Sequence, residues 1–160
     1  MAHAPRRHRL TVVDNSPEVL ALLGDVLRLD GTEVTLLESA TLRDIEATDP
    51  DLLVIDLRLG TGGLAGLEVV RLVRSRSGLQ HLPVVICSAD HDQIAQHQDE
   101  LDRMNDVFTL PKPFSLDQLE SCVSAALART RAPVGRWDDI ATRPPLGDMT
   151  ASDRQAGEAG

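Results

Sequence analysis

Four polar residues with chemically useful side chains stand directly after short apolar runs of the sequence: Asp14, Asp56, Ser88 and Lys112. The run before Asp56, for example, is Leu52-Leu53-Val54-Ile55. If the runs are parallel strands, the four side chains meet at the carboxyl edge of one sheet, where open α/β sheets bind their ligands. Two carboxylates, a hydroxyl and an ammonium at that edge predict a pocket that handles phosphoryl groups.

The segments between these runs carry apolar residues at three- and four-residue spacing, which is typical of amphipathic helices. Ser16 is placed to cap the first helix, and Pro17 suits its first turn. We expect a further strand at Glu33–Leu37 and helices at Pro17–Leu29, Leu42–Ala47, Leu67–Arg74, Asp90–Met104 and Leu116–Leu127. Strands that alternate with helices in this way predict an α/β fold, a doubly wound five-stranded parallel sheet with helices on both faces.

The Asp90–Met104 helix is the least apolar of the expected helices. Its sparse apolar residues are Ile94, Leu101 and Met104. We therefore expect a loosely packed, partly exposed element, and elements of this kind are where switching motions concentrate.

The length of 160 residues suits one domain with terminal extensions. We expect a flexible arm at residues 1–8 and the domain at residues 9–129. From residue 130 to 160 the composition offers little apolar periodicity, so we expect a disordered tail that is too small for a separate output domain. Trp137 in that tail docks on a partner, folds back on the domain, or is a stray aromatic.

The charge of the chain disfavours nucleic acid as a partner. The formal net charge is -9, whereas nucleic-acid binding depends on Lys and Arg that neutralise phosphates. We also expect no membrane association, because no apolar run approaches the length needed to span a bilayer and the first residues lack a signal-peptide core. Cys87 lies inside an apolar strand, as a buried free thiol does. Together these features predict a soluble, cytoplasmic protein.

Taken together, these residues resemble the receiver domain of two-component response regulators. The resemblance covers about Arg9 to Ala128, and its strongest parts are Val12-Val13-Asp14, the run from Asp51 to Leu57, Ser88-Ala89 and Lys112-Pro113-Phe114. The order of these motifs and their position at strand ends make the resemblance specific. It implies a flavodoxin-like sheet with strand order 2-1-3-4-5.

The resemblance also implies a role for each site residue. Asp56 would be the phosphoacceptor, attacking a phosphorus in line to form an aspartyl phosphate. Mg²⁺ would be held by Asp14, Asp56 and the backbone carbonyl of Arg58. Lys112 would pair with the phosphoryl oxygens, and Ser88 would donate a hydrogen bond to one of them. The protein would then be a switch that catalyses only its own phosphorylation and dephosphorylation.

Asn15 departs from the family pattern, which has a second acidic residue at this position that commonly ligates the metal. An amide oxygen can coordinate Mg²⁺ but brings no charge. The lost carboxylate contact predicts Mg²⁺ binding that is roughly tenfold to a hundredfold weaker.

Two further departures from the family pattern lie in the loop after Asp56 and in the strand before Lys112. The loop from Leu57 to Gly66 looks about two residues longer than the family norm and has no proline, which we interpret as a flexible connector. Thr109 holds a position that is often aromatic in the family, and Phe108 lies one residue earlier. A shift of one residue in a strand turns the ring to the other face.

We therefore expect a stand-alone receiver that takes a phosphoryl group from a histidine kinase or a histidine phosphotransfer protein. Its output would be contact with a downstream protein, through surfaces near residues 90–104 and 116–127. The sequence does not decide whether the chain also forms a homodimer through the same surface. One alternative is a receiver-like adaptor that needs no phosphorylation. A lesser one is a hydrolase of the aspartyl-phosphate type, but Arg58 occupies the place where such enzymes commonly have a second carboxylate.

Overall fold

A computed structural model describes residues 7–28, 31–60 and 65–130 of the chain. In chain order the elements are β1 (Arg9–Val13), α1 (Pro17–Arg28), β2 (Glu33–Leu37), α2 (Leu42–Thr48), β3 (Leu52–Ile55), α3 (Ala65–Ser75), β4 (Val84–Ser88), α4 (His91–Gln96), α5 (Gln98–Arg103), β5 (Val107–Pro111) and α6 (Leu116–Thr130). The expectations for the arm at residues 1–6, for the tail with Trp137 and for glycines 62 and 63 lie outside the described residues.

The strands form one parallel sheet in the order β2-β1-β3-β4-β5. This order confirms the predicted doubly wound fold. Two strands meet β1 from opposite sides, since β2 and β3 both pair with it. The gap where the order reverses therefore opens beside the carboxyl ends of β1 and β3, which is where such sheets bind ligands.

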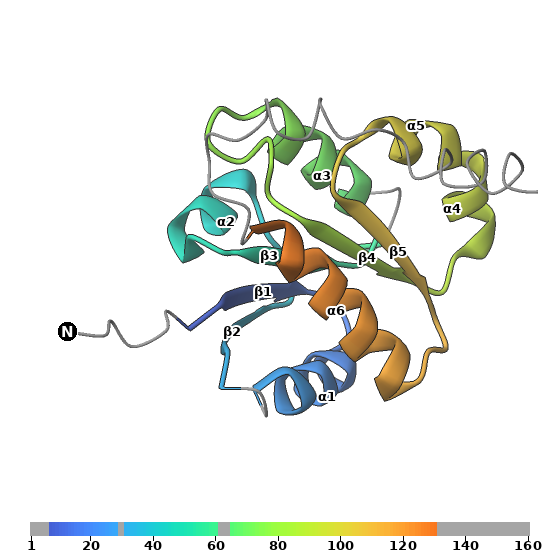
Figure 1. The fold of residues 1–160 in the computed structure, drawn as a ribbon. Helices are drawn as coiled ribbons and strands as arrows, with labels where there is room; N and C mark the ends of the chain where they lie inside the picture. The colour runs from blue at the N-terminus through green and yellow to red at the C-terminus, as the bar shows by residue number, and fades with distance from the viewer. Residues whose placement is uncertain (1–6, 29–30, 61–64, 131–160) are drawn as a thin grey trace, which may run out of the picture.

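Alternate residues of the central strands serve two hydrophobic cores, one on each face of the sheet. In β3, Leu53 and Ile55 pack on the side of α2, α3, α4 and α5, whereas Leu52 and Val54 pack on the side of α1 and α6. Figure 1 shows α1 and α6 together on one face and α2 and α3 on the other. All four β3 side chains are buried, as expected for a strand covered on both faces.

The cap predicted for the first helix is present. The Ser16 hydroxyl accepts a hydrogen bond from the backbone N–H of Val19 at 3.4 Å. This cap fixes where the chain turns from β1 into α1, directly behind Asp14.

The prediction of one helix over Asp90–Met104 was wrong, so the described residues contain six helices instead of five. The segment divides into α4 and α5 at His97, whose backbone (φ -102°, ψ 8°) leaves the helical region. No glycine or proline marks this break. The position of α5 is set by tertiary contacts, because Leu101 is buried and Glu100 forms two bonds to Arg71 of α3.

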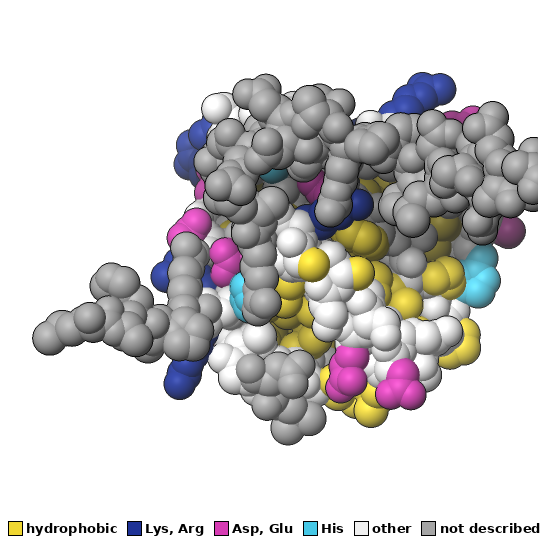
Figure 2. Space-filling view, viewed as in Figure 1, with side chains coloured by type: hydrophobic (Ala, Val, Ile, Leu, Met, Phe, Trp, Pro, Cys, Tyr) yellow, Lys and Arg dark blue, Asp and Glu magenta, His cyan; other side chains and the backbone are white. Residues whose placement is uncertain are grey.

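A hollow of about 390 Å³ lies between α1 and α6, and its lining combines apolar residues such as Val26 and Val123 with polar ones such as Glu120 and Ser124. Figure 2 shows hydrophobic side chains gathered in this seam. Leu10, near the start of β1, also lines the hollow. The hollow therefore lies toward the amino end of β1, at the opposite edge of the sheet from the polar residues that follow the strands. None of the described helices is long and apolar enough to cross a membrane.

Candidate functional site

The sheet places all four predicted polar residues at its carboxyl edge. Asp14 and Asp56 directly follow β1 and β3, Ser88 is the last residue of β4, and Lys112 directly follows β5. Their backbones remain tied to the neighbouring strands. The N–H of Asp56 donates to the carbonyl of Val13 at 3.0 Å, and the N–H of Lys112 donates to the carbonyl of Ser88 at 2.9 Å. The strand ladder itself therefore sets their spacing.

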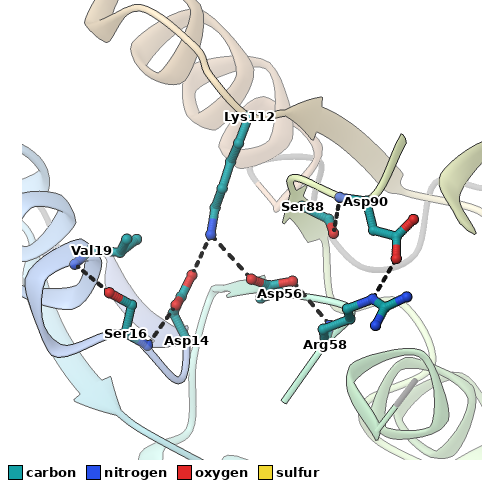
Figure 3. A network of polar contacts seen from close by, with 8 residues as sticks. All are labelled: Asp14, Ser16, Val19, Asp56, Arg58, Ser88, Asp90 and Lys112. Atoms are coloured by element: carbon teal, nitrogen blue, oxygen red, sulfur yellow. Dashed lines mark hydrogen bonds and ion pairs between the residues drawn. The ribbon is translucent and has the colours of Figure 1, made fainter. Parts of the chain in front are cut away.

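Lys112 joins the two carboxylates of the site. Its Nζ lies 2.7 Å from Oδ2 of Asp14 and 3.1 Å from Oδ2 of Asp56 (Figure 3). Asp14 is 2% exposed and Asp56 is 9% exposed, so both negative charges depend on this ammonium group. Burial alone would lower the pKa of Lys112, but the hydrogen bond to Asp14 and the charges of both carboxylates outweigh it and raise the pKa above its ordinary value.

The second oxygen of each carboxylate is held by the backbone two residues further on. Oδ1 of Asp14 accepts the N–H of Ser16 at 2.9 Å, and Oδ1 of Asp56 accepts the N–H of Arg58 at 3.0 Å. Each carboxylate is thus fixed in orientation by one backbone donor and one ammonium donor. A carboxylate held in this way is a positioned nucleophile or metal ligand rather than a freely rotating charge.

Ser88 lies at the same edge but has a different partner. Ser88 is 1% exposed, and its hydroxyl accepts a hydrogen bond from the N–H of Asp90 at 3.2 Å. Asp90 in turn bonds to the guanidinium of Arg58 (Figure 3). The structure thus brings Asp14, Asp56 and Lys112 into direct contact and places Ser88 beside them in a second hydrogen-bonded group.

The oxygen ligands at this edge suit a hard cation of modest affinity. Mg²⁺ is held in proteins by one or two carboxylates together with carbonyl oxygens and waters. The described residues contain no cluster of three His, Cys, Asp or Glu side chains with metal-binding geometry. The set available here is Asp14 and Asp56, with the amide of exposed Asn15 directly after Asp14 and the backbone carbonyl of Arg58 two residues after Asp56. These residues fit Mg²⁺ by chemical type, with one carboxylate fewer than a triad would offer.

Gly66 is a site residue that the sequence reasoning missed. A Cβ on Gly66 would lie 1.8 Å from the backbone oxygen of Asp56, so no other residue fits without moving the chain. Its N–H donates to the carbonyl of Leu57 at 2.9 Å. The loop glycines were interpreted as a flexible connector, which is wrong for Gly66. Nothing in the sequence marked this contact, because the expected helix began at Leu67 and Gly66 stood among the other glycines of the loop.

The displacement of the aromatic ring to the other face of β5 is confirmed. Phe108 is half-buried and packs in the core on the side of α1 and α6. It is paired with Val85 of β4, which belongs to the same core. Thr109 occupies the neighbouring register position, so no aromatic side chain stands at the place three residues before Lys112.

Comparison with known proteins places this fold and this edge in one family. Residues 10–124 match the family model of the response regulator receiver domain. The chain belongs to the response regulator receiver family.

Curated relatives agree with this assignment. The receiver is 32% identical to the response regulator MprA of Mycolicibacterium vanbaalenii over 155 residues, which cover 91% of the chain and 64% of the relative. It is 35% identical to the response regulator MprA of Mycobacterium avium over 125 residues, which cover 77% of the chain and 52% of the relative. The matches thus span between about half and two thirds of these relatives' lengths.

Solved structures share the fold. The receiver domain of Nitrogen Regulatory Protein C is 27% identical, with a TM-score of 0.65 over 76% of this chain and 95% of that one. The receiver domain of the sensor histidine kinase PA1611 from Pseudomonas aeruginosa is 22% identical, with a TM-score of 0.65 over 77% of this chain and 99% of that one. That second structure has a magnesium ion coordinated in its active-site cleft.

Proposed function

We propose that this receiver is a phosphoacceptor switch of a two-component phosphorelay and that Asp56 takes the phosphoryl group. The observation that carries the proposal is the Asp56 carboxylate, which lies at the sheet edge between the ammonium of Lys112 and the N–H of Arg58. A histidine kinase or a histidine phosphotransfer protein would supply the phosphoryl group.

The chemistry needs only positioning and charge neutralisation. An oxygen of Asp56 attacks the phosphorus of a phosphohistidine in line, and the P–N bond breaks as the new P–O bond forms. The imidazole nitrogen keeps the electron pair of the broken bond and takes up a proton. Lys112 is placed to neutralise charge on the transferred group, and such neutralisation supplies most of the rate in phosphoryl transfer.

Mg²⁺ is the cofactor that we propose for this step, held by Asp14, Asp56, the backbone carbonyl of Arg58 and the amide of Asn15. When bound, it would add positive charge against the phosphoryl oxygens. The magnesium in the cleft of the PA1611 receiver supports this choice. Ser88 would turn its hydroxyl from Asp90 to a phosphoryl oxygen.

The output that we propose is contact with a downstream protein in the cytoplasm. The surface formed by α4, β5 and α6 is suited to report the state of the site. Lys112 follows β5 directly, and Nε2 of His91 at the start of α4 lies 2.7 Å from the Lys112 carbonyl oxygen. A change at Lys112 would therefore reach both elements, and a second copy of the receiver is one partner this surface could accept.

A second candidate is a receiver-like adaptor that works without phosphorylation, and Asn15 is the observation that favours it. The retained contacts of Lys112 with both carboxylates argue for the phosphoacceptor. A small-molecule hydrolase is disfavoured, because the residue two positions after Asp56 is Arg58 and its guanidinium is paired with Asp90.

Intact-protein mass tests the proposal. The chain is incubated with Mg²⁺ and acetyl phosphate, a small acyl phosphodonor, beside the Asp56→Asn variant. We expect a gain of one phosphoryl group in the wild type and none in the variant. If the wild type gains nothing at high Mg²⁺ with several donors, the phosphoacceptor proposal fails and the adaptor takes its place.

A further inference from the structure

A second ion pair crosses the mouth of the site. Nε of Arg58, from the loop after β3, pairs with Oδ2 of Asp90, from the loop after β4. The Arg58 side chain is 58% exposed and that of Asp90 is 18% exposed. The two residues form part of an open depression that also includes Ala89, His91 and Asp92. Figure 3 shows the pair next to the Asp56 carboxylate.

Arg58 is anchored at the nucleophile by its own backbone. Its N–H donates to Oδ1 of Asp56 at 3.0 Å, so its guanidinium is borne by a residue that already touches the attacking group. An exposed arginine side chain can turn about its rotatable bonds without disturbing a core. The planar guanidinium also binds phosphate oxygens in a bidentate manner, which makes arginine well suited to a phosphoryl group.

Charge favours a change of partner once Asp56 is phosphorylated. A phosphoryl group brings about two negative charges, whereas Asp90 offers one. Lys112 is already shared between Asp14 and Asp56. Other arginines on this face of the sheet have partners away from the site, as Arg71 does with Glu100 and Arg76 with Glu46. Arg58 is the cation placed to meet the additional charge.

We propose that Arg58 is a ligand of the phosphoryl group and that it exchanges Asp90 for that group when Asp56 is phosphorylated. This inference rests on the proposed function. It assigns a role to the Arg58 side chain, whereas the metal site uses only the backbone carbonyl of this residue.

Asp90 is then a competitor for Arg58 as well as a helix cap. Its Oδ1 accepts the N–H of Gln93 at 3.1 Å and so caps α4. That backbone hydrogen bond, together with the bond to Arg58, holds the pKa of Asp90 below its usual range, so the pair is ionic at neutral pH. When Arg58 leaves, Asp90 keeps the cap, and α4 loses its tie to the loop after β3.

The exchange predicts opposite effects for the two partners. Arg58→Gln removes the ligand, so the phosphoryl group on Asp56 should be hydrolysed about three to ten times faster. Asp90→Asn keeps the oxygen that caps α4 but removes the competing charge, so the phosphoryl group should last about two to five times longer. The double variant should behave like Arg58→Gln. A structural role of the pair would instead move both single variants in the same direction.

The experiment follows the intact mass of the full chain after the phosphodonor is removed, in wild type, the three variants and Arg71→Gln. Arg71→Gln is the matched control, because it breaks an exposed arginine–carboxylate pair on the α3–α5 side and should leave the lifetime unchanged. Urea midpoints of all variants establish that each is folded.

Two failures can be told apart. If the wild type gains no phosphoryl group, the proposed function and this inference both fail. If the wild type is phosphorylated but the Arg58→Gln and Asp90→Asn lifetimes equal that of wild type or shift in the same direction, only the exchange is overturned.

Discussion

Lys112 supplies the positive charge that neutralises the carboxylates of the site. Two carboxylates with little solvent contact share this one ammonium group, at 2.7 Å and 3.1 Å. It is also the only lysine in the sequence, since all the other basic side chains apart from histidine are arginines. A lone lysine placed after an apolar strand is therefore a sequence signal of a specific role. A compact ammonium can neutralise two carboxylates at once and still approach an incoming phosphoryl group.

Removal of this ammonium should destabilise the fold. Lys112→Gln leaves Asp14 and Asp56 buried together without a cation. We expect the free energy of unfolding to fall by about 2–4 kcal/mol at pH 7, from urea unfolding. The matched control is Arg76→Gln, which breaks an exposed pair with Glu46 and should cost less than about 0.5 kcal/mol. Equal midpoints for Lys112→Gln and wild type would contradict this account of the site.

The same residue predicts a dependence of stability on alkaline pH. The pKa of Lys112 is raised on folding, so its contribution is complete below the unfolded lysine pKa of about 10.4 and is lost as pH rises through the folded value. Burial raises the pKa of Cys87 to about 12, which changes stability in the same direction. Wild type and Lys112→Gln both keep this cysteine, so the difference between their free energies of unfolding isolates the contribution of the lysine. That difference should shrink as pH rises above about 10.4, and a constant difference would refute the assignment.

Asn15 sets the expected strength of metal binding. Asn15→Asp restores a carboxylate beside Asp14 and should tighten Mg²⁺ binding by roughly tenfold to a hundredfold. Calorimetric titration of both proteins with Mg²⁺ measures the difference. Asn15 is exposed, so the substitution should leave the unfolding midpoint without Mg²⁺ nearly unchanged. Equal Mg²⁺ affinities would contradict the metal site.

Gly66 should tolerate no side chain. In Gly66→Ala the new Cβ would overlap the backbone of Asp56, so α3 and the phosphoacceptor loop must separate. We expect a loss of about 3 kcal/mol or more in urea unfolding, at the upper end of overpacking effects. Gly78→Ala is the control: it has open space and a φ of +92°, so it should cost only about 1 kcal/mol of backbone strain. Similar losses in the two variants would argue against a special contact at Gly66.

At the scale of elements, the segment between β4 and β5 differs from the rest of the fold. The helices α4 and α5 have six residues each, and each buries one apolar side chain, Ile94 or Leu101. Helices this short are marginal unless packing holds them. Polar contacts also help to hold the two helices in place: Arg71 bonds to Glu100 of α5, and His91 of α4 bonds to the Lys112 carbonyl oxygen.

Hydrogen exchange should therefore be fastest in this segment among the helices and strands. We expect the backbone amides of α4 and α5 to exchange about ten to a hundred times faster than those of β3 and β4, through local opening. Mass spectrometry of deuterated peptides measures this difference in the unphosphorylated chain. Equal protection of α4, α5 and the central strands would contradict a locally weak α4–α5 segment.

The sequence predicted the strands well and the tertiary detail poorly. Short, continuous apolar runs locate β1, β3 and β4 because these strands are buried on both faces, whereas β5 is only partly buried. The polar residues at or directly after the ends of these four strands mark the site. The break at His97 arises from packing between distant segments. The contact of Gly66 with Asp56 arises where the start of α3 approaches the end of β3. Neither leaves a local period in the sequence. The Arg58–Asp90 pair joins residues of two separate loops and is equally invisible in the sequence.

At the scale of the whole molecule, one open sheet with a reversed strand order gathers the phosphoacceptor, its cation and the candidate metal ligands at a single edge. The formal net charge is -9, and at this edge Lys112 and Arg58 are the cations that face the carboxylates of Asp14, Asp56 and Asp90. These two cations are the groups at this edge that could pair with an anionic phosphoryl group.

The central claim is that Asp56 itself carries the phosphoryl group, and chemical mapping tests it most directly. Borohydride reduces an aspartyl phosphate to homoserine and leaves a free carboxylate unchanged. After phosphorylation, reduction and digestion, we predict homoserine at position 56 in the wild type and no conversion in a sample without phosphodonor. A phosphorylated chain with Asp56 intact and another residue modified would contradict the claim.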